Sequence, residues 1–291
     1  MNLLRKNYEV ILDGPKQINW DEYNLKVSSE YNKLLEEHAD SEKVFQEFFE
    51  RNPCYLPGGL ELFGQSGHYP YMHTLISQPD IGIVNTRRPD FLWLANDSLT
   101  FTPVFIEIEK PSKKMFNKDG NTTAEFNQAL GQIKQWKYIL NDANNILAFY
   151  EKFNIPLDLR KREFKPQFLL VYGRRKEYEG NELLTGIRAE QRNGNVDIMS
   201  YDRLRPLSDY KQFICCKVQN TDYKVMNIPP TFRYRADCAE ELLKMQGFYE
   251  QIDNMKNTSE ERKEFLKSRY QYWIEFGKLS CKGLMCSQEG E

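Results

Sequence analysis

Residues 89–111 contain two short apolar runs that are separated by a polar turn, and each run carries carboxylates at one end. Asp90 opens the first run, and Glu107 and Glu109 close the second. Alternate residues of a β-strand point to the same face, so the two glutamates are expected to project together. Pairing of the two runs as a hairpin brings Asp90 beside them. The stretch therefore predicts a hairpin with three carboxylates at one end of a sheet.

Three neighbouring carboxylates repel one another unless a cation or a proton lies between them. Mg²⁺ prefers oxygen ligands of this kind, and Mn²⁺ is the alternative metal. The competing interpretation is that the glutamates are solvated charges on the rim of a sheet, where such charges discourage aggregation. The stretch by itself leaves both interpretations open.

The order of the predicted elements favours an α/β fold with a mixed sheet flanked by helices. A helix over 122–140 joins the second run to a buried strand at 168–172. A connection of this length permits a right-handed crossover between parallel strands. Thr122 with Glu125, and Thr258 with Glu261, have the spacing of helix capping boxes. Further strands are expected near 8–12, 196–200, 213–218 and 223–228, helices at 20–38, 41–51, 180–192, 237–253 and 259–279, and loops over 56–88.

Glutamines line one side of the helix expected at 122–140, opposite its apolar side. A neutral amide can lie against a metal–carboxylate centre or a phosphate without adding charge, although a solvated row is the alternative. On the helix expected at 41–51, Glu42 and Gln46 share a face. This face is either a solvated edge or a polar edge over the carboxylates. The glutamines are Gln128, Gln132 and Gln135.

The net charge of −2 and the isoelectric point near 6.1 exclude a global basic field for nucleic acid. A nucleic-acid binder of this composition needs a local basic groove. Arg87 and Arg88 directly precede the Pro-Asp step, and Lys113 and Lys114 follow the glutamates. These four are the candidate phosphate contacts, with plain solvated charge as the alternative.

Six scattered cysteines without a CxxC pair, and three histidines that are not at zinc-ligand spacing with them, give no expectation of a zinc site. His68 and His73 are candidates for substrate contact or ordinary loop residues. Reduced thiols and the lack of a secretory signal predict a cytoplasmic protein. No apolar run is long enough to span a membrane, and we expect no organic cofactor.

The order of Pro89-Asp90, then Glu107-x-Glu109-Lys110-Pro111, then a glutamine-bearing helix resembles the PD-(D/E)xK restriction-endonuclease-like core. More narrowly, the chain resembles the Shedu anti-phage nuclease family over about residues 40–230. The resemblance implies a nuclease domain at 41–230, an N-terminal segment at 1–40 and a helical C-terminal extension at 231–291. The matching stretches are 42–53, 88–92, 106–111, 132–136, 170–174 and 200–204.

The resemblance implies a metal-dependent DNA endonuclease of a bacterial defence system, acting on phage DNA and forming a homo-oligomer. Asp90, Glu107 and Glu109 would be its magnesium ligands, Gln128 and Gln132 would border the site, and Glu42 would reach it from the first helix. Glu109 stands where the wider pattern has lysine, which gives a Glu-x-Glu variant. Lys110 points to the opposite face of the strand; Lys114, Lys134 or Lys137 are alternative sources of positive charge.

Two other functions remain open at this stage. A nuclease-like module without catalysis, which binds nucleic acid or a protein, is favoured by the missing lysine and the slightly acidic balance. A nuclease directed at RNA differs from the first hypothesis only in its substrate.

Overall fold

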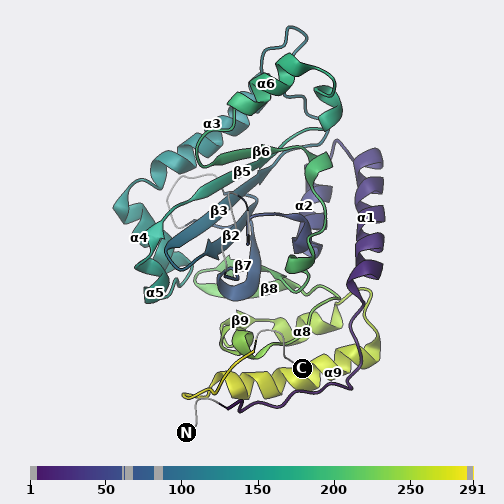
Figure 1. Cartoon of the computed structure of the whole chain (residues 1–291), viewed down its shortest axis with the longest axis vertical. Coiled ribbons are helices and arrows are strands. Elements are labelled where there is room, and N and C mark those ends of the chain that lie inside the picture. Colours follow the sequence, from purple (N-terminus) through teal and green to yellow (C-terminus); the bar gives the residue numbers. More distant parts are fainter. Residues whose placement is uncertain (1–4, 61, 63–67, 82–87, 287–290) are drawn as a thin grey trace.

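The computed structural model describes residues 5–60, 62, 68–81, 88–286 and 291, and over these ranges it has one mixed sheet of nine strands (Figure 1). The strand order is β6-β5-β3-β2-β1-β7-β8-β9, and β4 pairs with β3 off this path. The predicted α/β class is confirmed. The strands are β1 (Thr74–Ser77), β2 (Phe91–Asn96), β3 (Thr100–Ile108), β4 (Glu163–Phe164), β5 (Gln167–Val171), β6 (Val196–Met199), β7 (Ile214–Gln219), β8 (Asp222–Asn227) and β9 (Met245–Gln246).

The predicted hairpin is formed by β2 and β3, which run antiparallel with Phe91 opposite Ile106. Its turn is closed by Asp97, whose Oδ1 accepts the backbone N–H groups of Leu99 and Thr100, as aspartate commonly does in turns. Strand β5 lies parallel to β3 on the other side. The chain between them includes the expected helix, so the predicted parallel crossover is also confirmed.

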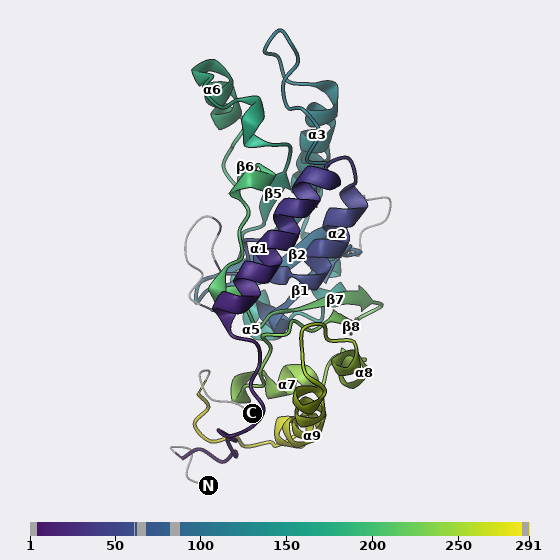
Figure 2. The ribbon, with the colours of Figure 1, turned by 90° about the vertical axis from the view of Figure 1, so that its right-hand side faces the viewer.

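Helices cover both faces of the sheet (Figures 1 and 2). Phe91 and Trp93 of β2 pack in the apolar cluster on the side of α1 and α2, whereas Leu92 and Leu94 pack in the cluster on the side of α3 and α4. This alternation follows from the two-residue repeat of a strand, and it explains why apolar residues occur on both faces of β2. The helices are α1 (Trp20–Glu37), α2 (Glu42–Arg51), α3 (Ala124–Ile139), α4 (Ala143–Lys152), α5 (Leu157–Arg160) and α6 (Glu182–Glu190).

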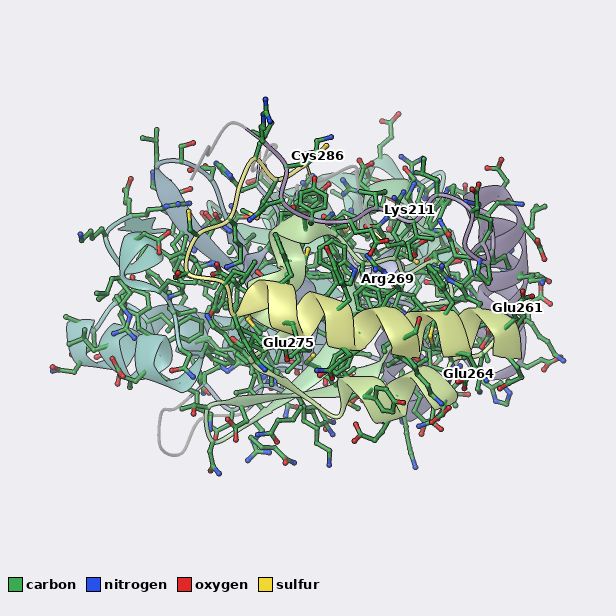
Figure 3. All side chains as sticks on the ribbon, turned by 90° about the horizontal axis from the view of Figure 1, so that it is seen from below. Lys211, Glu261, Glu264, Arg269, Glu275 and Cys286 are labelled. Atoms are coloured by element: carbon green, nitrogen blue, oxygen red, sulfur yellow. The ribbon has the colours of Figure 1, made fainter. Side chains whose placement is uncertain are left out.

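The C-terminal segment contributes α7 (Ala239–Leu242), the strand β9, α8 (Phe248–Asp253) and α9 (Glu260–Gly277). The N-terminal residues run along α9: Arg269 donates to the Glu9 carbonyl at 3.0 Å, and the Tyr272 hydroxyl accepts the Glu9 N–H at 2.6 Å. Glu261, Glu264 and Glu275 are exposed on the outer side of α9 (Figure 3). None of the helices in the described ranges is both long and apolar enough to cross a membrane.

Two predicted elements are wrong. Residues 8–12 form no strand, because their backbone is used to cover α9. The helix expected over 237–253 is interrupted by β9, which pairs in parallel with β8. Gly247 follows with a φ of 73°, a left-handed conformation that ends one element and starts the next. Tertiary pairing here prevails over the local helical pattern.

Smaller differences concern short elements and caps. Strand β1 lies inside the stretch expected to be loops; all of its four residues are buried, so they show no alternation that would reveal a strand. Thr123 caps α3 and Ser259 caps α9 through side-chain hydrogen bonds, one residue later than the predicted Thr122 and Thr258. The predicted boundaries of the three chain segments stay predictions.

Candidate metal centre

The hairpin register brings Asp90 and Glu107 together. Continuing the β2–β3 pairing by one residue beyond Phe91 and Ile106 places Asp90 opposite Glu107. Asp90 Oδ2 accepts the backbone N–H of Ile108 at 2.8 Å. This bond ties the Asp90 side chain to the end of β3. The two carboxyl groups therefore lie together where β2 begins and β3 ends.

Glu107 is held from the other side by helix α3. Gln132 Nε2 donates to Glu107 Oε1 at 2.7 Å, and both side chains are buried, with 8% and 9% of their residues' surfaces exposed. The second oxygen, Glu107 Oε2, is buried and accepts no hydrogen bond from any described residue. A buried carboxylate oxygen without a donor is costly, and a cation beside it would remove that cost.

The three glutamines of α3 differ in how deeply they are buried. Gln132 is buried against Glu107, whereas Gln128 and Gln135 are exposed. Gln128 lies one turn before Gln132, and its side chain makes no hydrogen bond within the described part of the chain. The predicted role of Gln132 beside the carboxylates matches its position, and that of Gln128 stays a prediction.

Burial and mutual repulsion oppose ionisation of the carboxyl groups. Burial, with further contributions from Glu42 and Glu109, raises the pKa of Asp90 to about 7. Burial and the charges of Asp90, Glu109 and Glu42 raise the pKa of Glu107 to about 10, against the opposing hydrogen bond from Gln132. At neutral pH Glu107 therefore retains its proton, and Asp90 is about half protonated, unless a cation takes the place of the proton.

Glu109 follows β3 and is neutralised by Lys113. The segment from Lys110 to Lys113 turns sharply, with Lys113 N–H donating to the Lys110 carbonyl at 3.1 Å and Pro111 in the turn position that proline favours. Lys113 Nζ thereby returns to within 2.5 Å of Glu109 Oε2. Sequence reasoning treated Lys113 only as a DNA contact and missed this ion pair, although Pro111 was a signal for the turn.

Two residues from neighbouring elements hold this turn in place. The Tyr201 hydroxyl donates to the Glu109 carbonyl at 2.6 Å, and Tyr201 is fully buried. Gly173, two residues after β5, has a φ of 61°, and a Cβ atom there would lie 2.7 Å from the Lys113 carbonyl oxygen. Glycine therefore allows both the left-handed backbone and the close approach of the turn.

Glu42 approaches from the N-terminal end of α2 and is half-buried. Burial and the charge of Glu109 raise the pKa of Glu42, which shows that the helix brings a further carboxyl group towards the site. Gln46, one turn later, points elsewhere: its amide donates to Glu50 and to Ser77 Oγ, each at 3.2 Å. The shared polar face of α2 thus serves two different contacts.

Among the described residues, Lys113 is the predicted cation that forms an ion pair with one of these carboxylates. Arg88, Lys114 and Lys134 are exposed, so their proposed contacts with phosphate or support of the site stay predictions. Lys137 is half-buried, with its Nζ near Gly194. Arg87 lies outside the described residues.

The donor set suits a hard divalent cation. Asp90, Glu107 and Glu109 offer carboxylate oxygens, and Glu107 Oε2 lacks a donor from the described residues. Mg²⁺ and Mn²⁺ are bound through oxygen ligands. Asp90 and Glu107 therefore fit such an ion as a pair. Among the described residues, Glu109 does not join them in a group of three whose ligand atoms lie within 4.8 Å of one another, because its Oε2 contacts Lys113.

Residues 39–205 match the family model described as "Shedu protein SduA, C-terminal". The match covers more than half of the chain and includes every candidate carboxylate, Gln132 and Lys113. A comparison with curated proteins finds no match for this chain. The resemblance predicted from the sequence motifs is confirmed.

Proposed function

The chain belongs to the Shedu family, and we propose that it is a metal-dependent DNA endonuclease with Asp90, Glu107 and Glu109 as metal ligands. Membership of this family implies a role in anti-phage defence. We further propose that the mixed sheet and its helices form a PD-(D/E)xK core in its Glu-x-Glu form. The crossover from β3 to β5 and the carboxylates at the ends of β2 and β3 support this assignment.

The observation that carries the proposal is the buried oxygen Glu107 Oε2. It lies beside another acidic group, Asp90, and receives no hydrogen bond from the described residues. An ionised glutamate in such a place would destabilise the fold unless a cation neutralised it. A buried carboxyl group whose pKa is strongly raised is typical of functional sites.

The side chains have different roles in the proposed reaction. A divalent cation would supply an activated water molecule and neutralise charge on the scissile phosphate. The Ile108 N–H orients Asp90, and Gln132 orients Glu107; the two carboxyl groups lie close enough to share a hydrogen bond. Lys113 keeps a positive charge beside Glu109, close to the position where the wider pattern has lysine. Exposed Arg88 and Lys114 would contact the DNA backbone without reading its sequence.

A nuclease-like module without catalysis is the second candidate. The observation in its favour is the Glu109–Lys113 ion pair, because a carboxylate neutralised by lysine has less need of a metal. This candidate predicts no specific binding of Mg²⁺ or Mn²⁺ at the three carboxylates, whereas the nuclease requires it.

A cleavage assay with the purified chain tests the proposal. We expect linear, nicked or supercoiled double-stranded DNA, or single-stranded DNA, to be cut with Mg²⁺ or Mn²⁺, and cutting to stop when a chelator removes the metal. Calorimetric titration with each metal is expected to show binding to the wild type and none to a Glu107→Gln, Asp90→Asn double variant. Inactivity on all four substrates, together with no metal binding, would leave the non-catalytic module as the better explanation. An RNA panel run alongside tests for RNA cleavage.

Lys113 is expected to matter more than its neighbour Lys114. Lys113→Met removes the charge beside Glu109 and should lower the cleavage rate about 10- to 100-fold, the range typical of residues that support metal ligands. Lys114→Met is the matched control, since Lys114 is exposed and its loss should only weaken DNA binding uniformly. Single-turnover rates at saturating protein separate these effects. Equal losses in both variants would show that Lys113 acts as another phosphate contact.

A further inference from the structure

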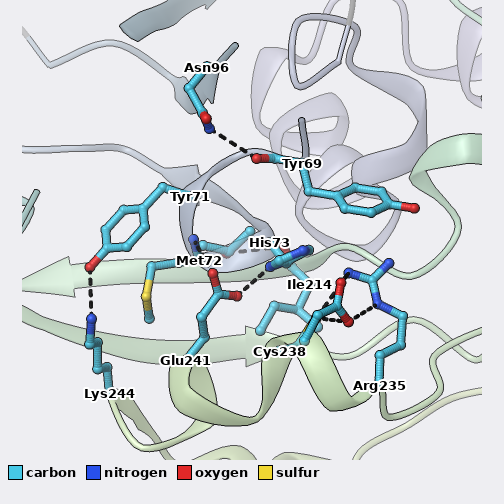
Figure 4. A network of polar contacts seen from close by, with 12 residues as sticks. Tyr69, Tyr71, Met72, His73, Asn96, Ile214, Arg235, Cys238, Glu241 and Lys244 are labelled. Carbon is cyan, nitrogen blue, oxygen red and sulfur yellow. Dashed lines mark hydrogen bonds and ion pairs between the residues drawn. The ribbon is translucent and has the colours of Figure 1, made fainter. Parts of the chain in front are cut away.

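A second group of metal-ligating side chains lies where the C-terminal segment meets the sheet. One ligand atom each from His73, Cys238 and Glu241 can be chosen so that all three atoms lie within 4.8 Å of one another. Figure 4 shows the His73 ring between Glu241 and Arg235. The carboxylates Asp90, Glu107 and Glu109 do not belong to this group.

Local structure explains how the three side chains converge. Cys238 ends a short 3-10 turn and directly precedes α7, which contains Glu241; a spacing of three residues places both on one side of the turn. Met72 and His73 have positive φ values of 64° and 47°, a strained conformation that persists only where surrounding contacts enforce it. Glu241 supplies such contacts: Oε1 accepts the Met72 N–H at 3.1 Å, and Oε2 contacts His73 Nδ1.

The imidazole has one nitrogen that no hydrogen bond explains. His73 Nδ1 contacts Glu241, whereas Nε2 is buried and has no hydrogen-bond partner in the described ranges. A buried ring nitrogen without a partner is costly. The nitrogen that faces Glu241 is Nδ1, so an ion shared by His73 and Glu241 would take the place of the proton between Nδ1 and Oε2.

The Cys238 sulfur has two polar neighbours. Arg235 Nη2 lies 3.0 Å from Cys238 Sγ, and Sγ lies 3.6 Å from Asp237 Oδ1. The guanidinium is itself anchored to Asp237 and stacked on the Tyr69 ring, 4.3 Å from its centroid. Histidine and cysteine release their protons when they bind a metal ion, so an ion here would replace protons on His73 and Cys238.

We propose that His73, Cys238 and Glu241 bind a zinc ion that clamps α7 to the sheet. Nitrogen and sulfur ligands select zinc over magnesium or calcium. A cavity of about 30 Å³ lined by the three residues has room for a water molecule as a fourth ligand. His73 directly precedes β1, so the ion would join the C-terminal segment to the strand beside β2. Spacing rules miss the site because its histidine and cysteine are far apart in the sequence.

Metal analysis of the full-length chain tests this site. After incubation with Zn²⁺ and removal of the excess on a chelating resin, mass spectrometry should find about one zinc per wild-type chain and less than about one-tenth in Cys238→Ser and His73→Ala. Cys281→Ser, which changes a cysteine outside the group, should retain the ion. Glu107→Gln should also retain it, which separates this site from the proposed nuclease centre.

Replacement of zinc by Co²⁺ gives a readout in the wild-type chain that does not depend on the folding of any variant. We expect a thiolate-to-cobalt charge-transfer absorption and protection of Cys238 from alkylation. Zinc retained by Cys238→Ser, or cobalt bound without the thiolate absorption, would overturn the proposal. So would a wild type that binds no zinc, in which case His73 and Glu241 form a plain ion pair.

Discussion

Glu107→Gln is expected to lower the rate of metal-dependent DNA cleavage by at least about 100-fold. This loss is larger than the effect expected for a residue that only supports a metal ligand. Glutamine has the same size, and its side-chain oxygen can still accept the hydrogen bond that Gln132 donates to Glu107. The substitution therefore removes the charge of a metal ligand while it preserves the packing. Cleavage rates at saturating Mg²⁺ measure the loss.

The matched control is Glu125→Gln, the same chemical change at an exposed position of α3. Its cleavage rate should stay within about twofold of the wild type, because exposed substitutions away from a site have small effects. Circular dichroism establishes that both variants are folded. An unchanged rate in Glu107→Gln would remove Glu107 from the proposed site, whatever the fate of the other carboxylates.

The metal-free protein is expected to lose stability as the pH rises from about 5 towards 9. Burial and repulsion raise the pKa of Asp90 to about 7 and that of Glu107 to about 10. A carboxyl group whose pKa is raised by folding contributes stability below its unfolded pKa, and this contribution is lost as the pH rises through its folded pKa. Each such group can cost up to about 1.4 kcal/mol per pH unit within that window.

Comparison with Glu107→Gln isolates this contribution from the rest of the chain. The variant carries no charge at residue 107, so it should unfold at a higher temperature than the metal-free wild type at pH 8. The difference should reach at most about 1.4 kcal/mol for each pH unit above the pKa of a glutamate in the unfolded chain, which corresponds to several degrees. The difference should shrink towards pH 5. Mg²⁺ should raise the melting temperature of the wild type and leave the variant nearly unchanged. A difference that is constant with pH would show that Glu107 is not held under electrostatic strain.

Local sequence patterns predicted the parts of the site that lie on regular elements. The alternation of β2 and β3 places Glu107 on one face, and the Pro-Asp step places Asp90 at the start of the partner strand. The helical repeat of α3 brought Gln132 to the right side of the helix. These predictions succeed because strand and helix periodicity determine which residues share a face.

Patterns were weaker where contacts between distant segments decide the structure. Helical spacing at 237–253 was overridden by the pairing of β9 with β8. The run at 8–12 was used to cover α9 rather than to join the sheet. The glutamine row was divided by burial, because only Gln132 meets Glu107. In each case the energy of packing against another element exceeds the local preference.

The sequence by itself determined the family, the α/β class and the hairpin that carries Asp90 and Glu107, because motifs and short-range spacing specify each of them. Only the tertiary structure decided how those carboxylates behave. It buried Glu107, left Oε2 without a donor among the described residues, and returned Lys113 to Glu109 through a turn that Gly173 accommodates. It also joined His73 to Cys238 and Glu241. Burial and charge proximity are properties of the folded chain, and they set the pKa of a carboxyl group and the affinity of a site for a cation.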